Sequence, residues 1–351
     1  MGLDARGVTE VTTTPVGVIT LSALGLSDTA LCPTLEREKV FTGVVETVSG
    51  NTITVSGSPG WVSNQFVYSS TVQRNTYYLL ISSGLRSGAF YTVTGNTGNS
   101  MTVDPAGENL QAILASGVMF DVVPYWTLNT LFPSGQGFKV SPSFTPVSTI
   151  IIPNPNQVGA SIPASDKYFY YNGTALGGAG WRKVGGVATT KYDDMAIMPD
   201  SHFIVRHNYS GNTEFKVIGR VRTSGFQTAI GTIQPNTRQD NHLGFPYPVP
   251  MTLTKTGFYQ SGAVAGSTSF TPTDLVLVYD NSITALNKPP TAKYFYYTGT
   301  ALGGAGWRKV GATATAKFDD VEVIAPGVGF IIQKAPVASP SSQMYTSSIS
   351  Y

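Results

Sequence analysis

The sequence predicts an all-β fold, in which an N-terminal β-domain precedes two tandem homologous units of β-sandwich or barrel-like form. Charged residues make up 12% of the chain, about half of the roughly 25% usual in globular proteins. The 42 threonines, 18 tyrosines and 17 phenylalanines suit a pleated, half-buried surface, and 38 glycines and 22 prolines argue against long helices. One segment also occurs twice, at residues 167–194 and 293–320, with five differences in 28 positions.

The first 120 residues, 1–120, are predicted to form a domain of β-hairpins. Residues 41–55 alternate apolar and polar side chains around a Ser-Gly-Asn turn, and residues 91–103 repeat this pattern around a longer loop. Glycine and asparagine accept the positive φ angles that such turns require. Residues 108–116 are the best candidate for a helix, of at most about two turns.

Two repeat units are predicted to follow, spaced 126 residues apart (293 − 167 = 126). In each unit a short apolar run, 150–152 or 276–278, precedes the repeated segment and is expected to be a core strand. The predicted boundaries are 121–212 for the first unit, 213–242 for a connector that contains strands, 243–335 for the second unit and 336–351 for a C-terminal tail.

The repeated segment contains the strongest candidate site residues, on a hairpin with an aromatic strand, a Gly-rich loop and a returning Trp-Arg-Lys strand. A tryptophan beside tyrosines is one way to form a stacking platform for a sugar ring. We favour a structural role, in which the tryptophan packs inside the unit and the basic residues pair with the aspartates. The candidates are Tyr168, Tyr170, Trp181, Arg182, Asp193 and Asp194 in the first copy, and Tyr294, Tyr296, Trp307, Arg308, Asp319 and Asp320 in the second.

The paired aspartates also raise the question of calcium, because this cation binds several oxygen ligands at once. Neither pair lies in a loop with acidic residues at regular alternating spacing. We therefore expect ion pairing or turn capping at both pairs, and no bound metal.

The sequence contains no recognisable catalytic motif. Its histidines, His202, His207 and His242, and its single cysteine, Cys32, show no metal-ligand spacing, and no GxSxG motif is present. We predict no enzymatic activity and no cofactor. The 22 Lys and Arg residues are scattered, so we expect no nucleic acid as a partner. No apolar run approaches the roughly 18 residues that suggest a membrane span.

Several longer motifs resemble those of a known family. They are TTTPVGVITLSALGLSDT at 12–29, FTGVVETVSGNTITV at 41–55, PYWTLNTLF at 124–132, and, in the repeat units, YFYY, GWRKVG, an Asp pair and PGVGFIIQK at 326–334. Together they resemble an uncharacterised family of secreted β-rich repeat proteins known mainly from verrucomicrobial and related bacterial genomes. The resemblance implies export to the cell surface or medium and carries no established activity. Residues 1–17 contain no apolar signal-peptide core, so the extracellular location is expected from resemblance and composition.

We therefore expect a non-enzymatic extracellular structural protein that assembles with copies of itself, as a filament or a surface layer. The net charge of +2 provides little of the self-repulsion that keeps proteins monomeric. Either terminal segment is suited to complete the sheet of a neighbouring copy by strand addition. The residues expected in such contacts are Val16, Val18, Ile19 and Leu21 near the N-terminus, and Met344, Tyr345, Ile349 and Tyr351 near the C-terminus.

Three alternatives stay open at this point. Each terminal segment can instead complete a sheet within its own chain. The aromatic hairpins can make the protein a binding module for cell-surface polysaccharide. A phage tail or fibre component would use the same chemistry in a different assembly.

Overall fold

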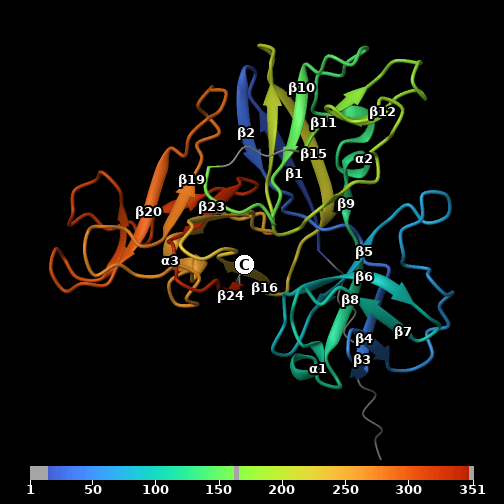
Figure 1. Cartoon of the computed structure of the whole chain (residues 1–351), viewed down its shortest axis with the longest axis horizontal. Helices are drawn as coiled ribbons and strands as arrows, with labels where there is room; N and C mark the ends of the chain where they lie inside the picture. The colour runs from blue at the N-terminus through green and yellow to red at the C-terminus, as the bar shows by residue number, and fades with distance from the viewer. Residues whose placement is uncertain (1–14, 162–165, 348–351) are drawn as a thin grey trace, which may run out of the picture.

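The computed structural model describes residues 15–161 and 166–347, which form a nearly all-β protein (Figure 1). Strands account for 39% of the residues and helices for 5%, which confirms the predicted all-β class. The helices are single turns: α1 (Leu110–Ile113), α2 (Leu128–Leu131), α3 (Leu253–Thr256) and the 3₁₀ turn Pro133–Gly135. No described helix has the length and apolar character needed to cross a bilayer.

Two five-stranded antiparallel sheets contain the two copies of the repeated segment. The first has the strand order β12-β11-β10-β14-β2, and the second has the order β17-β23-β19-β20-β21. Both repeated hairpins have the same register, with Tyr170 opposite Trp181 and Tyr296 opposite Trp307. The first sheet contains β2 (Ser27–Leu31), β10 (Ser148–Ile152), β11 (Asp166–Tyr171), β12 (Gly180–Lys183) and β14 (Phe203–His207). The second contains β17 (Gln239–Leu243), β19 (Leu275–Val278), β20 (Ala292–Tyr297), β21 (Gly306–Lys309) and β23 (Phe330–Lys334).

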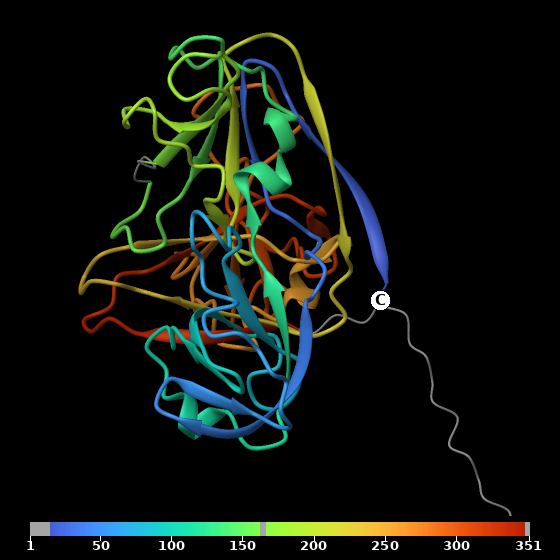
Figure 2. The same cartoon turned by 90° about the vertical axis from the view of Figure 1, so that its right-hand side faces the viewer.

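Two longer two-stranded ribbons accompany these sheets. Figure 2 shows the first, β1 with β15, along the outer rim of the molecule. The second pairs β16 with β24, and two very short ribbons pair β9 with β13 and β18 with β22. Their bounds are β1 (Val16–Ala23), β15 (Thr213–Arg220), β16 (Phe226–Gly231), β24 (Ser342–Ser347), β9 (Trp126–Thr127), β13 (Ala196–Ile197), β18 (Met251–Thr252) and β22 (Glu322–Ile324).

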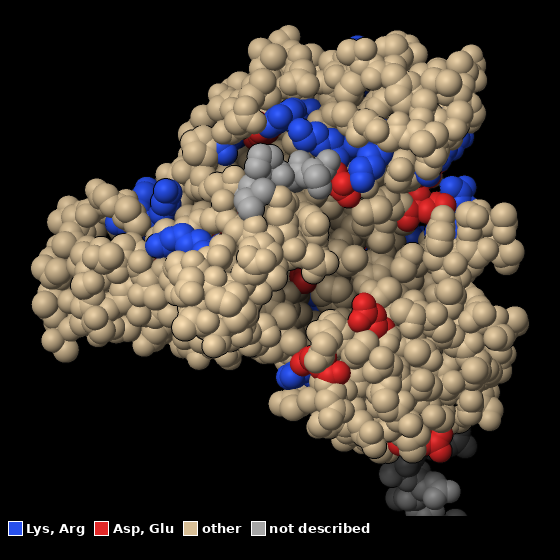
Figure 3. All heavy atoms as spheres, viewed as in Figure 1, with Lys and Arg blue, Asp and Glu red and all other residues tan. Residues whose placement is uncertain are grey.

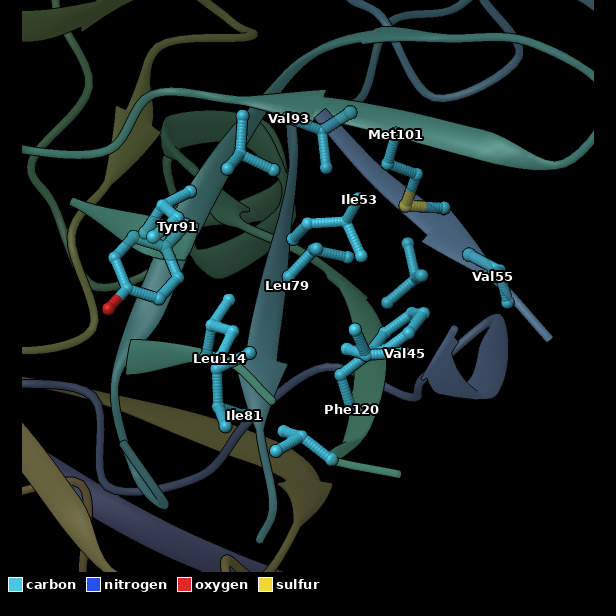
Figure 4. Close-up of a cluster of buried hydrophobic side chains, with 14 of the residues drawn as sticks. Val45, Ile53, Val55, Leu79, Ile81, Tyr91, Val93, Met101, Leu114 and Phe120 are labelled. Atoms are coloured by element: carbon cyan, nitrogen blue, oxygen red, sulfur yellow. The ribbon is translucent and has the colours of Figure 1, made fainter. Parts of the chain in front are cut away.

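The remaining six strands form a closed barrel in the order β3-β4-β7-β6-β5-β8. Both predicted hairpins, β3–β4 and β6–β7, are present. Alternate side chains point inward and fill the barrel, including Val45, Ile53, Leu79, Met101 and Phe120, all fully buried (Figure 4). The bounds are β3 (Phe41–Ser49), β4 (Thr52–Val55), β5 (Tyr77–Ile81), β6 (Phe90–Asn96), β7 (Ser100–Val103) and β8 (Met119–Pro124).

The strand pairing differs from the predicted domain boundaries at three places. β1 and β2 fall inside the predicted domain 1–120, yet they pair with β15 and β14. The predicted connector 213–242 supplies β15, β16 and β17 to three different sheets, and the predicted tail 336–351 supplies β24. Alternation identifies a strand but not its partner, which explains why these boundaries were not visible in the sequence.

Each five-stranded sheet sends a loop to the outer strand of the other sheet. The loop after β19 reaches β2, where Asp28 donates its N–H to Ala285 O (2.9 Å) and its Oδ2 accepts the N–H of Asn287 (2.8 Å). Directly after β2, Cys32 donates its N–H to Gly327 O at 2.9 Å. The outer edge of β2 is therefore occupied.

The loop after β10 covers β17 with the same set of hydrogen bonds. Asp240 donates its N–H to Gly159 O (3.0 Å), and its Oδ2 accepts the N–H of Ser161 (2.8 Å). Gly244 donates to Asp200 O at 2.9 Å. The two sets are reciprocal, so the sheets cover each other's outer strands.

Candidate functional site

The two repeated tryptophans are core residues. Trp181 is 0% exposed and Trp307 is 1% exposed. Trp181 packs edge-on against Phe138 at 5.1 Å and Tyr170 at 5.7 Å, and Trp307 packs the same way against Tyr296 at 5.5 Å. No indole face is available to stack on a sugar, which contradicts the platform interpretation of these two residues.

The neighbouring tyrosines also pack within the chain. Tyr168 and Tyr294 are buried. Tyr170 lies over Gly135, where a Cβ atom would meet its ring at 2.7 Å. Tyr296 is half-buried and stacks on Tyr259, with ring centroids 3.7 Å apart. The aromatic strand therefore serves packing in both copies.

The buried Arg182 organises its own hairpin. Its guanidinium donates to four backbone carbonyls, those of Leu176 (3.2 Å), Gly178 (2.6 Å), Trp181 (3.2 Å) and Ala188 (2.9 Å). The predicted pairing of this arginine with the adjacent aspartates is not among its hydrogen bonds. The folded loop brings carbonyl oxygens around the guanidinium instead, and these satisfy its donors without a carboxylate.

Arg308 repeats this arrangement in the second copy. It donates to the carbonyls of Leu302 (3.2 Å), Gly304 (2.6 Å), Trp307 (3.2 Å) and Ala314 (3.0 Å). The distances agree with those of the first copy to within about 0.1 Å, so the conserved Arg position explains much of the identity between the two segments.

The first aspartate of each pair caps the returning strand. Asp193 Oδ1 accepts the N–H of Trp181 at 2.8 Å, and Asp319 Oδ1 accepts the N–H of Trp307 at 3.0 Å. Gly180 precedes the first of these donors with a φ of 151°, and a Cβ there would lie 3.0 Å from the Asp193 carboxylate. This agrees with the expected capping role.

The second aspartates differ between the copies. Asp194 pairs with Arg74 of the barrel domain at 2.8 Å and accepts a hydrogen bond from Tyr68 at 3.4 Å. Asp320 is exposed. The first copy therefore uses this residue to contact the barrel, an interaction that sequence comparison between the copies did not reveal.

β1 pairs with β15 within the same chain, over its entire length from Val16 to Ala23. Leu21 is buried in the core of the first sheet, Ile19 is half-buried, and Val16 and Val18 are exposed. This agrees with the alternative in which the N-terminal segment completes a sheet of its own chain.

β24 pairs with β16 in the same way. Tyr345 is 0% exposed and donates its hydroxyl to Thr256 O at 2.6 Å, while Met344 is half-buried. Ile349 and Tyr351 lie outside the described residues. The expectation that a terminal strand leaves its own chain is thus not met by β1 or β24, because both anchor buried side chains.

The outer edge of β1 nevertheless remains open. Val221 donates its N–H to Pro15 O, and hydrogen-bonded pairs alternate along an antiparallel ribbon. The odd-numbered residues of β1 therefore form main-chain hydrogen bonds with β15. The N–H and C=O groups of the even-numbered residues point away from β15. No described strand pairs with that outer side. The outward residues are Val16, Val18, Thr20 and Ser22.

The outer edge of β24 is open for the same reason. Thr232 donates its N–H to Ser341 O, so odd-numbered β24 residues bond β16. The groups of Ser342, Met344 and Thr346 point away, and no described strand pairs with them. Neither β1 nor β24 contains a charged residue.

The other edge strands in the described parts of the chain are covered, charged or very short. β2 and β17 are covered by the exchanged loops, and β16 is covered where Gln227 donates to Gly88 O. β15 carries the charged residues Glu214 and Lys216 on its outer edge. At Arg220 its main-chain N–H and C=O are both hydrogen-bonded to the main chain of Glu36. β12 and β21 are four residues long and end at the half-buried Lys183 and Lys309. β9, β13 and β18 are only two residues long. Short length and charge are the usual protection against edge pairing.

An apolar patch lies on the solvent side of the β1–β15 ribbon. Val16 is 64% exposed, Val18 63% and Ile218 60%, and Val18 lies directly opposite Ile218. Figure 3 shows the opposite side of the molecule, on which Lys, Arg, Asp and Glu side chains cluster around a central hollow. Contiguous exposed β-branched side chains beside an open edge are typical of a contact surface.

Two clefts adjoin the junction between the five-stranded sheets, with volumes of about 480 and 470 Å³. In the first, Arg206, Asp28 and Asp240 already have side-chain partners within the chain. Arg206 donates to both carboxylate oxygens of Asp28 at 2.6 Å, and Asp240 accepts a hydrogen bond from Gln333 at 2.8 Å. Each contact joins neighbouring strands of one sheet, β14 with β2 and β23 with β17.

The second cleft is lined by two contacting histidines. His202 Nδ1 donates to Leu243 O at 3.1 Å, and its Nε2 lies 3.4 Å from His242 Nδ1. Burial lowers the pKa of His202 to about 3 and that of His242 to about 4, so both are neutral at pH 7. In the described part of the chain, no histidine shares a hydrogen bond with a carboxylate. No cluster of three or more His, Cys, Asp or Glu placed to hold a metal occurs there either.

No protein-family model, curated protein or solved structure matches this chain.

Proposed function

We propose that this chain is a non-enzymatic structural protein that assembles with copies of itself by adding strands edge to edge. The observation that carries the proposal is the pair of open, uncharged edges on β1 and β24. An exposed, flat, uncharged edge is a template for pairing with another chain, and monomeric proteins protect such edges. Here the other described edges are covered, charged or very short, whereas β1 and β24 are eight and six residues long.

The repeated hairpins support a structural role. Their tryptophans, arginines and first aspartates are used for packing and for backbone hydrogen bonds. They leave no exposed Trp ring for a polysaccharide. The extracellular setting of the proposal rests on the low charge of the chain and on its family resemblance.

Strand addition at an open edge requires no terminal strand to leave its own sheet. The affinity would come from main-chain hydrogen bonds and the selectivity from alternate side chains. The exposed Val16 and Val18 add apolar area beside the β1 edge.

The proposal is tested by placing charges on one edge. The purified protein is expected to form oligomers or ordered polymers, seen by analytical ultracentrifugation and negative-stain microscopy. Val16→Lys/Val18→Lys should reduce this assembly at least tenfold, because charges on an edge oppose pairing. Ile218→Lys is the matched control, since it lies on the same exposed face but on the neighbouring strand.

A wild-type protein that stays monomeric at all concentrations, with its far-UV circular dichroism intact, would overturn the proposal. Monomers retained on a polysaccharide column would favour the binding-module alternative. Equal loss of assembly in the Ile218→Lys control would assign the contact to the apolar face and not to the edge.

A further inference from the structure

We propose that the open edge of β1 accepts the open edge of β24 from a second copy, so that copies join head to tail. This inference rests on the proposed self-assembly and names the partner edge. The two edges lie on different strands and on different ribbons, one accompanying each five-stranded sheet. Each chain therefore presents two distinct edges.

Pairing of unlike edges leaves no open edge inside the assembly. A β1–β1 contact is isologous and by itself closes at a dimer, which leaves the uncharged β24 edge of both copies exposed unless a second, separate β24–β24 contact covers it. A β1–β24 contact is heterologous, and it uses both edges of every chain except those at the ends of the assembly. The absence of charge on both strands fits the second arrangement, because an edge that stays exposed normally carries protection.

The side chains beside the two edges also match better across unlike strands. In β1 and β24 the residues whose main-chain groups point outward have their side chains on the solvent side. An antiparallel β1–β24 pair can place Val18 opposite Met344 and Val16 opposite Thr346. In the full-length antiparallel β1–β1 register, Val16 and Val18 instead face Ser22 and Thr20. The β1–β24 register thus places the apolar Val18 and Met344 together, whereas this β1–β1 register sets both valines against hydroxyl side chains.

Two single-edge variants separate these arrangements. Val16→Lys/Val18→Lys blocks the β1 edge, and Met344→Lys/Thr346→Lys blocks the β24 edge. Head-to-tail pairing predicts that each variant alone is monomeric, and that an equimolar mixture forms a one-to-one dimer that grows no further. The mixture restores pairing because each variant retains the edge that the other lacks.

Isologous pairing predicts different masses in the same ultracentrifugation experiment. The β24 variant alone would then dimerise through β1, and the mixture would form no mixed dimer. Either result would overturn head-to-tail pairing while leaving self-assembly in place. Failure of the underlying proposal is distinct, because the unmodified chain would itself be monomeric.

A disulfide test covers the case in which a charged variant does not fold. Val18→Cys and Met344→Cys are made in separate chains, mixed and oxidised. Cys32 stays silent because it is buried and its pKa is raised to about 12. Head-to-tail pairing predicts that mixed dimers exceed either homodimer at least fivefold by mass spectrometry. A majority of Val18→Cys homodimers would refute it.

Discussion

Replacing Trp181 with alanine should lower the free energy of unfolding by about 3–5 kcal/mol, and the same change at Trp307 should cost about as much. Both rings are at most 1% exposed, and both pack edge-on against the tyrosine opposite them on the paired strand. Alanine removes these contacts and leaves a cavity that the two paired strands cannot close. The two losses should be similar because each buried ring packs on the tyrosine opposite it, with Trp181 also packing against Phe138.

Two further variants test whether the loss of stability comes from the lost packing volume of the ring. The indole Nε1 of Trp181 donates to no described residue, so Trp181→Phe removes volume without removing a hydrogen bond. We expect it to cost about 1–2 kcal/mol, less than half of the alanine effect. Val187→Ala, at a site 68% exposed on the same hairpin, is the control and should change stability by less than about 0.5 kcal/mol.

Urea unfolding followed by far-UV circular dichroism measures these differences, from the shift of the midpoint at constant slope. A loss near zero for Trp181→Ala would refute the packing argument. It would mean that the ring is exposed in solution, and it would restore the sugar-stacking interpretation.

Stability should fall as the pH is lowered from 7 to 5, because burial lowers the folded-state pKa of His202 to about 3 and that of His242 to about 4. In the unfolded chain these histidines take up protons near pH 6.5, whereas in the folded chain they stay neutral down to pH 5. Each histidine therefore lowers the free energy of unfolding by about 2 kcal/mol at pH 5. Denaturation midpoints that do not change between pH 7 and 5 would contradict this. Arg182→Lys and Arg308→Lys should each lower the free energy of unfolding by about 2–4 kcal/mol, since a lysine ammonium cannot reach all four carbonyls. A melting temperature within 1–2 °C of wild type would show that the carbonyls find other donors. EDTA should leave the melting temperature unchanged, and a large drop reversed by calcium would show that the Asp pairs bind metal.

Local sequence patterns were sufficient to predict the two hairpins of the barrel. The alternation in residues 41–55 and 91–103 depends only on near neighbours, and both hairpins form as predicted. The repeated segment pairs in the same register twice because its 23 identical positions (28 − 5 = 23) include both strands and the Gly-rich loop. Its packing role could be inferred from that identity.

The partners of the polar residues in the hairpin could not be predicted from their spacing. Arg182 was expected to bind the adjacent aspartates, yet it donates to backbone carbonyls. Carbonyl groups are present at every position, so no residue type marks which of them will converge on a guanidinium. The contact of Asp194 with Arg74 likewise joins residues 120 positions apart.

The sequence by itself determined the all-β class, the hairpin turns and the repeated core, because these follow from composition, from alternation and from identity between the copies. Only the tertiary structure decided which strand edges are open. That property depends on partners far away in the chain, such as β15 for β1, the exchanged loops for β2 and β17, and the barrel for β16. A strand edge is open only when no other segment of the chain pairs with it. Local sequence patterns do not show which segments pair, so they cannot show which edges stay unpaired.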